Sequence, residues 1–125
     1  MMLDIDLQSR IPIYEQLYKK VVELVIKKQY MPNDKLPSVR ELAKELGVNP
    51  NTVSKAFQML ERDGIIYSLA GRGSFISDKN NDAILKNAKT NFANAVNEAF
   101  TAGLNETIMT DIIKEISCER SNSSD

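Results

Sequence analysis

The sequence predicts a mainly α-helical protein with one small β-hairpin: a winged helix-turn-helix domain followed by a helical dimerisation hairpin. Five segments carry apolar residues at helical spacing, and two short β-rich runs follow the third of them. The second and third helical segments are separated by a short turn that contains Gly47, which is typical of a helix-turn-helix. We divide the chain into a winged-helix domain, residues 1–77, and a short C-terminal helical domain with a polar tail, residues 78–125.

Composition excludes several classes of function. The chain has no histidine and one cysteine, Cys118, so histidine-based catalysis, the common His and Cys metal sites and an internal disulfide are excluded within it. It also lacks a glycine-rich phosphate loop, and we expect neither an enzyme nor a cofactor or metal. No apolar run approaches the roughly 20 residues that span a membrane. The N-terminus lacks the pattern of a signal peptide, and we expect a cytoplasmic protein.

The net charge differs slightly between the two parts of the chain. Residues 1–77 hold eleven Lys and Arg against nine Asp and Glu, a net charge of +2, whereas residues 78–125 hold five against eight, a net charge of −3. A polyanionic partner is therefore permitted for the first part and less favoured for the second.

The first three helices are predicted from apolar spacing and end signals. Residues 10–30 form the first, with Pro12 in its first turn, and a loop with two prolines follows. Ser38 and Glu41 form the capping box that starts the second, and Gly47 ends it. Asn49 then caps the third helix, with Pro50 as its first residue, and this helix ends at Gly64.

The rest of the chain predicts a hairpin and two more helices. Residues 65–68 and 74–77 are the strands, joined by a glycine-rich tip, and the polar residues 78–82 separate the domains. The fourth helix ends at Gly103, Asn105 caps the fifth, and residues 118–125 are expected to be a frayed tail. Two helices this short have little core of their own, so we expect their apolar stripes to pack against a second copy of the chain or against the first helix. We expect a dimer. The dimerisation residues we expect are Leu85, Ala88, Phe92, Ala95, Ala99, Phe100, Ile108, Ile112, Ile113 and Ile116.

The third helix has an apolar and a polar face. At about 100° per residue, Phe57 and Leu60 fall within about 40° of Val53 and predict the buried side. Polar residues lie about 100° or more from Val53. Asn and Gln can pair with adenine, and Lys can reach guanine or phosphate. Because the N-terminal residues of this helix meet base edges in helix-turn-helix proteins, the outward face predicts DNA contacts. Its members are Asn51, Ser54, Lys55, Gln58 and Arg62.

Two other places would add contacts. Ser38 and Arg40 at the start of the second helix offer free N–H groups and a guanidinium to a phosphate. Arg72, at the hairpin tip between Gly71 and Gly73, suits a narrow minor groove. Taken singly, these features are a helix cap, a solvated face and a turn. Their occurrence together and in order favours binding to double-stranded DNA.

These residues resemble the GntR family of bacterial transcription regulators over about residues 10–77. The matching segments are "PIYEQL", "LPSVRELAKELGVNPNTVSKAFQMLERDGII" and "GRGSF". The resemblance implies a winged helix-turn-helix that contacts DNA through the second helix, the start of the third helix and the wing. Many members carry Arg where this chain has Pro50 and Ser54. The positions implied are Arg40, Asn49, Asn51, Thr52, Ser54, Lys55, Gly71, Arg72 and Gly73.

The C-terminal part narrows the resemblance. Only 48 residues follow residue 77, too few for a large ligand-binding or aminotransferase-like domain. A short two-helix C-terminus is similar to the YtrA subfamily, which implies a dimeric repressor, often of an operon that encodes an ABC transporter. The sequence assigns neither an operator nor a small-molecule effector.

Two functions therefore stay open from the sequence. The first is a homodimeric, sequence-specific DNA-binding regulator whose two-fold symmetry implies a palindromic site. The alternative is a winged helix that serves only as a protein–protein interaction module, with the apolar C-terminal hairpin as its docking surface.

Overall fold

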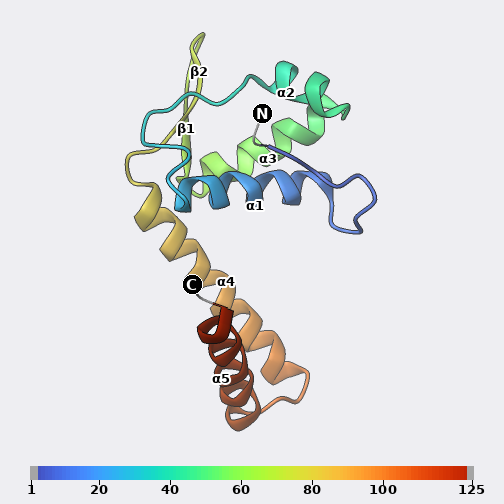
Figure 1. Cartoon of the computed structure of the whole chain (residues 1–125), viewed down its shortest axis with the longest axis vertical. Coiled ribbons are helices and arrows are strands. Elements are labelled where there is room, and N and C mark those ends of the chain that lie inside the picture. Colours follow the sequence, from blue (N-terminus) through green and yellow to red (C-terminus); the bar gives the residue numbers. More distant parts are fainter. Residues whose placement is uncertain (1–2, 124–125) are drawn as a thin grey trace. The chain divides into compact units, whose positions relative to one another are not determined.

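The protein is described from a computed structural model that covers residues 3–123, and the chain forms two compact units, residues 1–87 and 88–125. The first unit contains α1 (Ile13–Ile26), α2 (Val39–Leu46), α3 (Pro50–Arg62), β1 (Ile66–Leu69) and β2 (Gly73–Ile76) (Figure 1). Helix α4 (Asn80–Thr101) begins in the first unit and continues into the second, which also holds α5 (Glu106–Ser123). The predicted fold class, mainly α with one hairpin that forms a wing, is confirmed.

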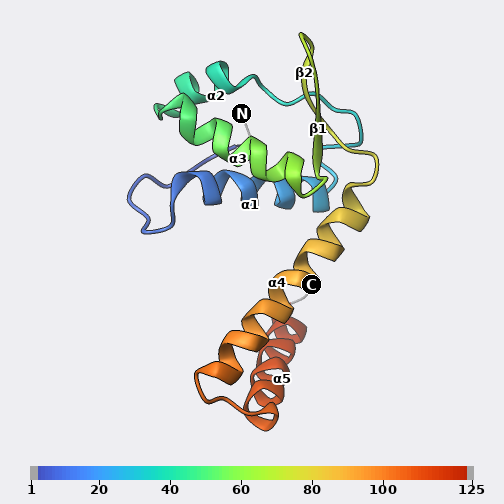
Figure 2. The same cartoon turned by 180° about the vertical axis from the view of Figure 1, so that it is seen from behind.

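The core of the first unit forms where α3 lies across α1, as both views show (Figure 1, Figure 2). Leu17 and Val21 of α1 and Leu60 of α3 are at most 1% exposed. Burying a leucine or valine side chain contributes about 1.5–3 kcal/mol, so these contacts hold the two helices together. Other buried residues of this core are Leu3, Leu24, Val25, Leu36, Leu42, Ala43, Val53, Ala56, Phe57, Ile65, Ile66 and Ile76.

Helix α1 ends earlier than the sequence predicts. Pro12 is its N-cap, and Lys28, with φ of 60°, stands in the left-handed region just after its end. The amide of Lys28 donates to the Val25 carbonyl (3.0 Å) and that of Gln29 to the Leu24 carbonyl (2.9 Å), the pattern of a Schellman motif. The predicted extension to residue 30 is wrong because this motif normally uses glycine, and lysine gives no such signal.

The predicted residues begin α2, end it and begin α3. Of the predicted capping box, the half in which Ser38 accepts is present, and within the described residues the Glu41 carboxylate makes no return bond to the Ser38 amide. Ser38 Oγ accepts from the Glu41 amide (3.1 Å), and Asn49 Oδ1 accepts from the Asn51 amide (2.8 Å). Gly47 has φ of 71°, a conformation that costs glycine little, so α2 stops and the chain turns into α3. Pro50 is the first residue of α3, where its missing N–H leaves no intrahelical bond unmade.

A third segment pairs with the hairpin, which the sequence does not predict. β1 and β2 pair antiparallel, with Ile66 opposite Ile76 and Tyr67 opposite Phe75. On the other side of β2, Lys35 forms a bridge with Phe75, and the Leu36 amide donates to the Ser74 carbonyl (2.9 Å). The segment before α2 is therefore part of the wing rather than a free loop.

The second unit is two helices joined at Gly103, which run side by side in opposite directions (Figure 1, Figure 2). Asn105 Oδ1 accepts from the Ile108 amide (2.9 Å), which confirms the predicted cap of α5. The predicted frayed tail is wrong for residues 118–123, which continue α5. No Gly or Pro interrupts the sequence there, and extending an existing helix is far easier than starting one. Residues 124–125 lie outside the described part.

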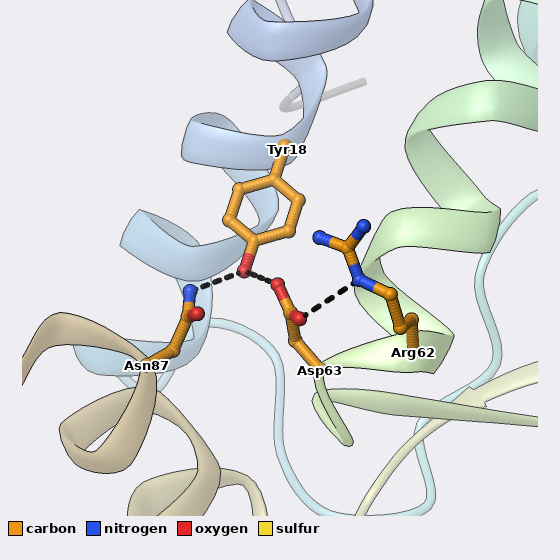
Figure 3. A network of polar contacts seen from close by, with 4 residues as sticks. All are labelled: Tyr18, Arg62, Asp63 and Asn87. Atoms are coloured by element: carbon orange, nitrogen blue, oxygen red, sulfur yellow. Dashed lines mark hydrogen bonds and ion pairs between the residues drawn. The ribbon is translucent and has the colours of Figure 1, made fainter. Parts of the chain in front are cut away.

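A polar network ties three helices of the first unit together (Figure 3). Tyr18 of α1 donates its hydroxyl hydrogen to Asp63 Oδ2 (2.5 Å) just after α3, and Asn87 Nδ2 of α4 donates to the Tyr18 hydroxyl (2.7 Å). Arg62 Nε pairs with Asp63 Oδ1 (3.2 Å). Burial, followed by the hydrogen bond to the Asp63 carboxylate, raises the pKa of Tyr18. The network fastens the beginning of α4 to the helix-turn-helix.

Substituting Tyr18→Phe is expected to lower the free energy of unfolding by about 1–2 kcal/mol, because a hydrogen bond to a charged group is lost. The control is Tyr67→Phe, whose hydroxyl donates to Asn33 Oδ1 (2.8 Å) in an exposed setting and should cost less. Because the folded state raises the pKa of Tyr18, this contribution is complete below pH of about 10 and declines above it. Urea unfolding at several pH values checks both points, and equal losses in the two variants would contradict the role of the network.

Candidate nucleic-acid interface

Helix α3 presents the polar face that its sequence predicts. Val53 is 0% exposed, whereas Asn51, Lys55 and Gln58 are exposed on the other side of the helix. The side-chain amides of Asn51 and Gln58 form no hydrogen bond within the described residues. Both are therefore free to pair with a base edge. Thr52 and Ser54 are partly exposed at the flanks of this face.

Lys55 has a contact that the sequence did not suggest. Its ammonium lies over the ring of Tyr14 in α1, with Nζ 3.9 Å from the ring centroid. Such a cation–π contact contributes about 0.5–1 kcal/mol at an exposed site. It restricts Lys55 to the part of the α3 surface beside the N-terminal end of α1. Tyr14 is therefore an additional residue of this surface.

The beginning of α2 supplies a free cation. Ser38 is exposed, but its hydroxyl oxygen already accepts the Glu41 amide, so the hydroxyl hydrogen is what remains for another partner. Arg40 is exposed, and within the described residues its guanidinium forms no hydrogen bond or ion pair. Asn49 likewise spends its side-chain oxygen on the α3 cap and keeps its Nδ2 group for another acceptor.

The wing tip is a tight turn that projects Arg72. The Arg72 amide donates to the Leu69 carbonyl (2.9 Å), and Gly71, at the third position of this turn, has φ of 75°. A positive φ at this position favours glycine. Arg72 is exposed, and no ion pair of its guanidinium occurs among residues 3–123. The turn thus holds an unpaired guanidinium away from the body of the domain.

Lys35 is a further cation that sequence reasoning missed. Its segment was predicted to be a loop, and only the bridge to Phe75 places it beside the wing. A Cβ added to Gly73 would lie 3.1 Å from Lys35 Cε, so the lysine stem passes directly over this glycine. The paired segment before α2 carries no distinct sequence signal, since prolines and Asn-Asp dominate it.

The predicted dimerisation residues are mostly exposed in the single chain. Phe92 and Phe100 of α4 are 57% and 55% exposed, and Ile112 of α5 is 42% exposed. None of residues 88–122 is buried. Leu85 belongs to the first unit, unlike the other nine positions. The full set is Leu85, Ala88, Phe92, Ala95, Ala99, Phe100, Ile108, Ile112, Ile113 and Ile116, of which Ala99 alone is partly covered.

No group of three or more His, Cys, Asp or Glu in residues 3–123 is placed to hold a metal ion. Within the same residues, no helix has the length and apolar character needed to cross a membrane.

The helix-turn-helix and wing match a known family. Residues 13–76 match the family of bacterial regulatory proteins called gntR. The chain belongs to the GntR family. The HTH-type transcriptional repressor YtrA of Bacillus subtilis (strain 168) is 43% identical over 122 residues, which cover 94% of each chain. The GntR resemblance deduced from the sequence motifs is thus confirmed, and so is the YtrA-like character deduced from the short two-helix C-terminus.

Two solved structures are similar to this chain in fold. One described as a transcriptional antiterminator from Listeria monocytogenes EGD-e is 35% identical, with a TM-score of 0.66 over 94% of this chain and 90% of that chain. The AraR DNA-binding domain in complex with operator ORX1 is 27% identical, with a TM-score of 0.56 over 62% of this chain and 99% of that chain. This GntR-family winged helix is therefore similar to a domain that has been solved on DNA.

Proposed function

We propose that this GntR-family regulator is a homodimeric transcriptional repressor that binds a palindromic operator in double-stranded DNA. The observation that carries the proposal is the α3 surface, where a free polar face lies opposite a fully buried apolar one. The likeness to the AraR DNA-binding domain on its operator and to the YtrA repressor supports the same function. A bacterial regulator of this kind acts in the cytoplasm, where the chromosome lies.

In the proposed complex, α3 enters the major groove with its N-terminal half on the base edges. Asn51 and Ser54 are the proposed base contacts, with Thr52 and Lys55 on bases or phosphates. Ser38 and Arg40 at the start of α2, and Asn49 at the start of α3, are the proposed phosphate contacts. The wing places Arg72, between Gly71 and Gly73, in the minor groove. Because the α3 face carries little charge, Arg40 and Arg72 supply much of the phosphate affinity in this proposal.

The proposal of a dimer rests on the exposed apolar side chains of the second unit. A helical pair in which none of residues 88–122 is buried has too little core to be stable alone. We propose that the exposed apolar side chains of α4 and α5 pack against those of a second copy. A two-fold dimer presents two α3 helices to two half-sites, which implies a palindromic operator. From the family resemblance, we propose an operon for an ABC transporter as its target; no small-molecule effector is part of the proposal.

The test is fluorescence anisotropy with labelled DNA from upstream of the protein's own gene. The proposal expects this DNA to bind at least about a thousandfold more tightly than a scrambled duplex of equal length at the same salt concentration. Equal affinity for the two duplexes would overturn the proposal and favour a winged helix used only for protein contacts.

Substituting Arg40→Ala is expected to weaken operator binding by about 1–3 kcal/mol, because it removes the guanidinium and with it a charged contact to DNA. The control is Lys19→Ala, which removes an exposed positive charge of α1 about 160° around that helix from buried Val21. Both substitutions lie at exposed positions, and thermal unfolding should be unchanged within about 0.5 kcal/mol. An Arg40→Ala protein that binds as tightly as the Lys19→Ala control would show that α2 does not contact the DNA.

A further inference from the structure

Lys35 is fixed against the wing by its backbone. It forms a bridge with Phe75 of β2, flanked by the hydrogen bond from the Leu36 amide to the Ser74 carbonyl (2.9 Å) and that from the Ile76 amide to the Asp34 carbonyl (2.9 Å). Residues that lie directly opposite each other in such a pairing project from the same face. The Lys35 side chain therefore leaves the sheet on the face of Phe75, and its starting point is held.

Gly73 leaves room for the lysine stem. Gly73 and Phe75 are two residues apart in β2 and so share a face. A Cβ at Gly73 would lie 3.1 Å from Lys35 Cε and 3.9 Å from Lys35 Nζ. A contact of 3.1 Å is tighter than ordinary packing, so the lysine stem lies against Gly73 and would have to shift by a few tenths of an ångström if a Cβ stood there. The ammonium group consequently lies beside the residue that follows Arg72 at the wing tip.

The charge of Lys35 is not neutralised within the described residues. Its ammonium forms no ion pair or side-chain hydrogen bond there, and the residue is exposed. The carboxylate of the adjacent Asp34 accepts the Met31 amide through Oδ2 (2.8 Å). The wing therefore carries two unpaired cations, Lys35 with its stem beside Gly73 and Arg72 at the preceding position of the chain, from segments 37 residues apart.

We infer that Lys35 binds a DNA phosphate beside the groove that Arg72 enters, an inference that rests on the proposed DNA-binding function. A lysine ammonium on a flexible stem is a compact point charge that suits a phosphate oxygen. A contact of this kind positions the wing on the backbone and carries no sequence information. Lys35 thus contributes to affinity and to its dependence on salt, but not to the choice of operator.

The test is Lys35→Gln, which removes the charge and keeps most of the stem that lies over Gly73. Anisotropy is measured from about 50 to 200 mM salt on the upstream DNA and on a scrambled duplex. One lost phosphate contact lowers the slope of log K against log salt by about 0.9. The affinity for both duplexes should fall by the same factor, so that their ratio is unchanged. Lys35→Arg should restore the slope, and the control Lys19→Gln should leave it at the wild-type value.

The outcomes separate the two proposals. If the wild-type protein binds DNA in a salt-dependent way and Lys35→Gln has the same slope of log K against log salt, the role of Lys35 is overturned and the proposed function is not. A loss confined to the upstream DNA also overturns it, because that result would mean direct base recognition. Wild-type protein that binds neither duplex overturns both this inference and the proposed function. A change in the midpoint of thermal unfolding by Lys35→Gln would mean that the residue serves the fold of the wing instead.

Discussion

The double substitution Phe92→Glu and Ile112→Glu is expected to produce a monomer with operator affinity about 10²–10⁴-fold lower than that of the wild type. Both side chains are large, apolar and exposed, at 57% and 42%. A buried carboxylate without a partner is strongly unfavourable, so the proposed contact between copies cannot form. A monomer loses the effective concentration that links two half-sites, a factor of about 10²–10⁴. In free energy this is about 3–5.5 kcal/mol, more than any single DNA contact supplies.

Light scattering after gel filtration measures the mass, and anisotropy on duplexes with one or two half-sites measures the coupling. On the duplex with one half-site, the monomer should bind about as tightly as one subunit of the wild-type dimer. Asn91→Glu with Thr110→Glu is the matched control, since it adds the same charges at exposed polar positions of the same two helices. A wild-type monomer, or a Phe92→Glu/Ile112→Glu protein that stays dimeric, would contradict the proposed dimer.

The sequence predicted the parts of the fold that depend on local chemistry. Ser38, Gly47 and Asn49 each perform the role expected of that residue type at a helix end, and each does so through contacts with nearby residues. Periodicity was sufficient for α3, because Val53 and Leu60 are both 0% exposed. The end of α1 was not predictable in this way, since Lys28 adopts a left-handed conformation that its side chain does not favour.

The interface was predicted less completely because parts of it depend on pairing between distant segments. Asn51 and Lys55 lie on the outward face of one helix, and helical spacing alone places them. The contacts of Tyr14 with Lys55 and of Lys35 with the wing join residues about 40 positions apart. No local pattern marks such a contact, because each residue taken by itself is an ordinary surface tyrosine or lysine. The base and phosphate contacts of the individual site residues remain predictions.

Substituting Leu60→Ala is expected to lower the free energy of unfolding by about 2–5 kcal/mol, because it opens a cavity in the core between α1 and α3. Leu60 is 0% exposed, and a leucine of the same size at position 7 is 63% exposed. Leu7→Ala is therefore the matched control, with an expected loss within about 0.5 kcal/mol. Urea unfolding at one fixed protein concentration is the measurement, since dissociation of a dimer makes stability depend on concentration. Equal losses in the two variants would contradict the assigned core.

The Leu60→Ala variant also tests whether one face of α3 serves packing alone and the other serves DNA contact alone. Leu60 lies with Val53 on the buried side, and Asn51 and Lys55 are exposed on the other. Well below its unfolding midpoint, the folded Leu60→Ala protein should bind operator within about threefold of the wild type, because none of the proposed contacts is removed. A folded protein with much weaker binding would mean that packing under α3 also sets the position of its outward side chains. Operator affinity at low temperature, with circular dichroism to confirm folding, distinguishes loss of stability from loss of contact.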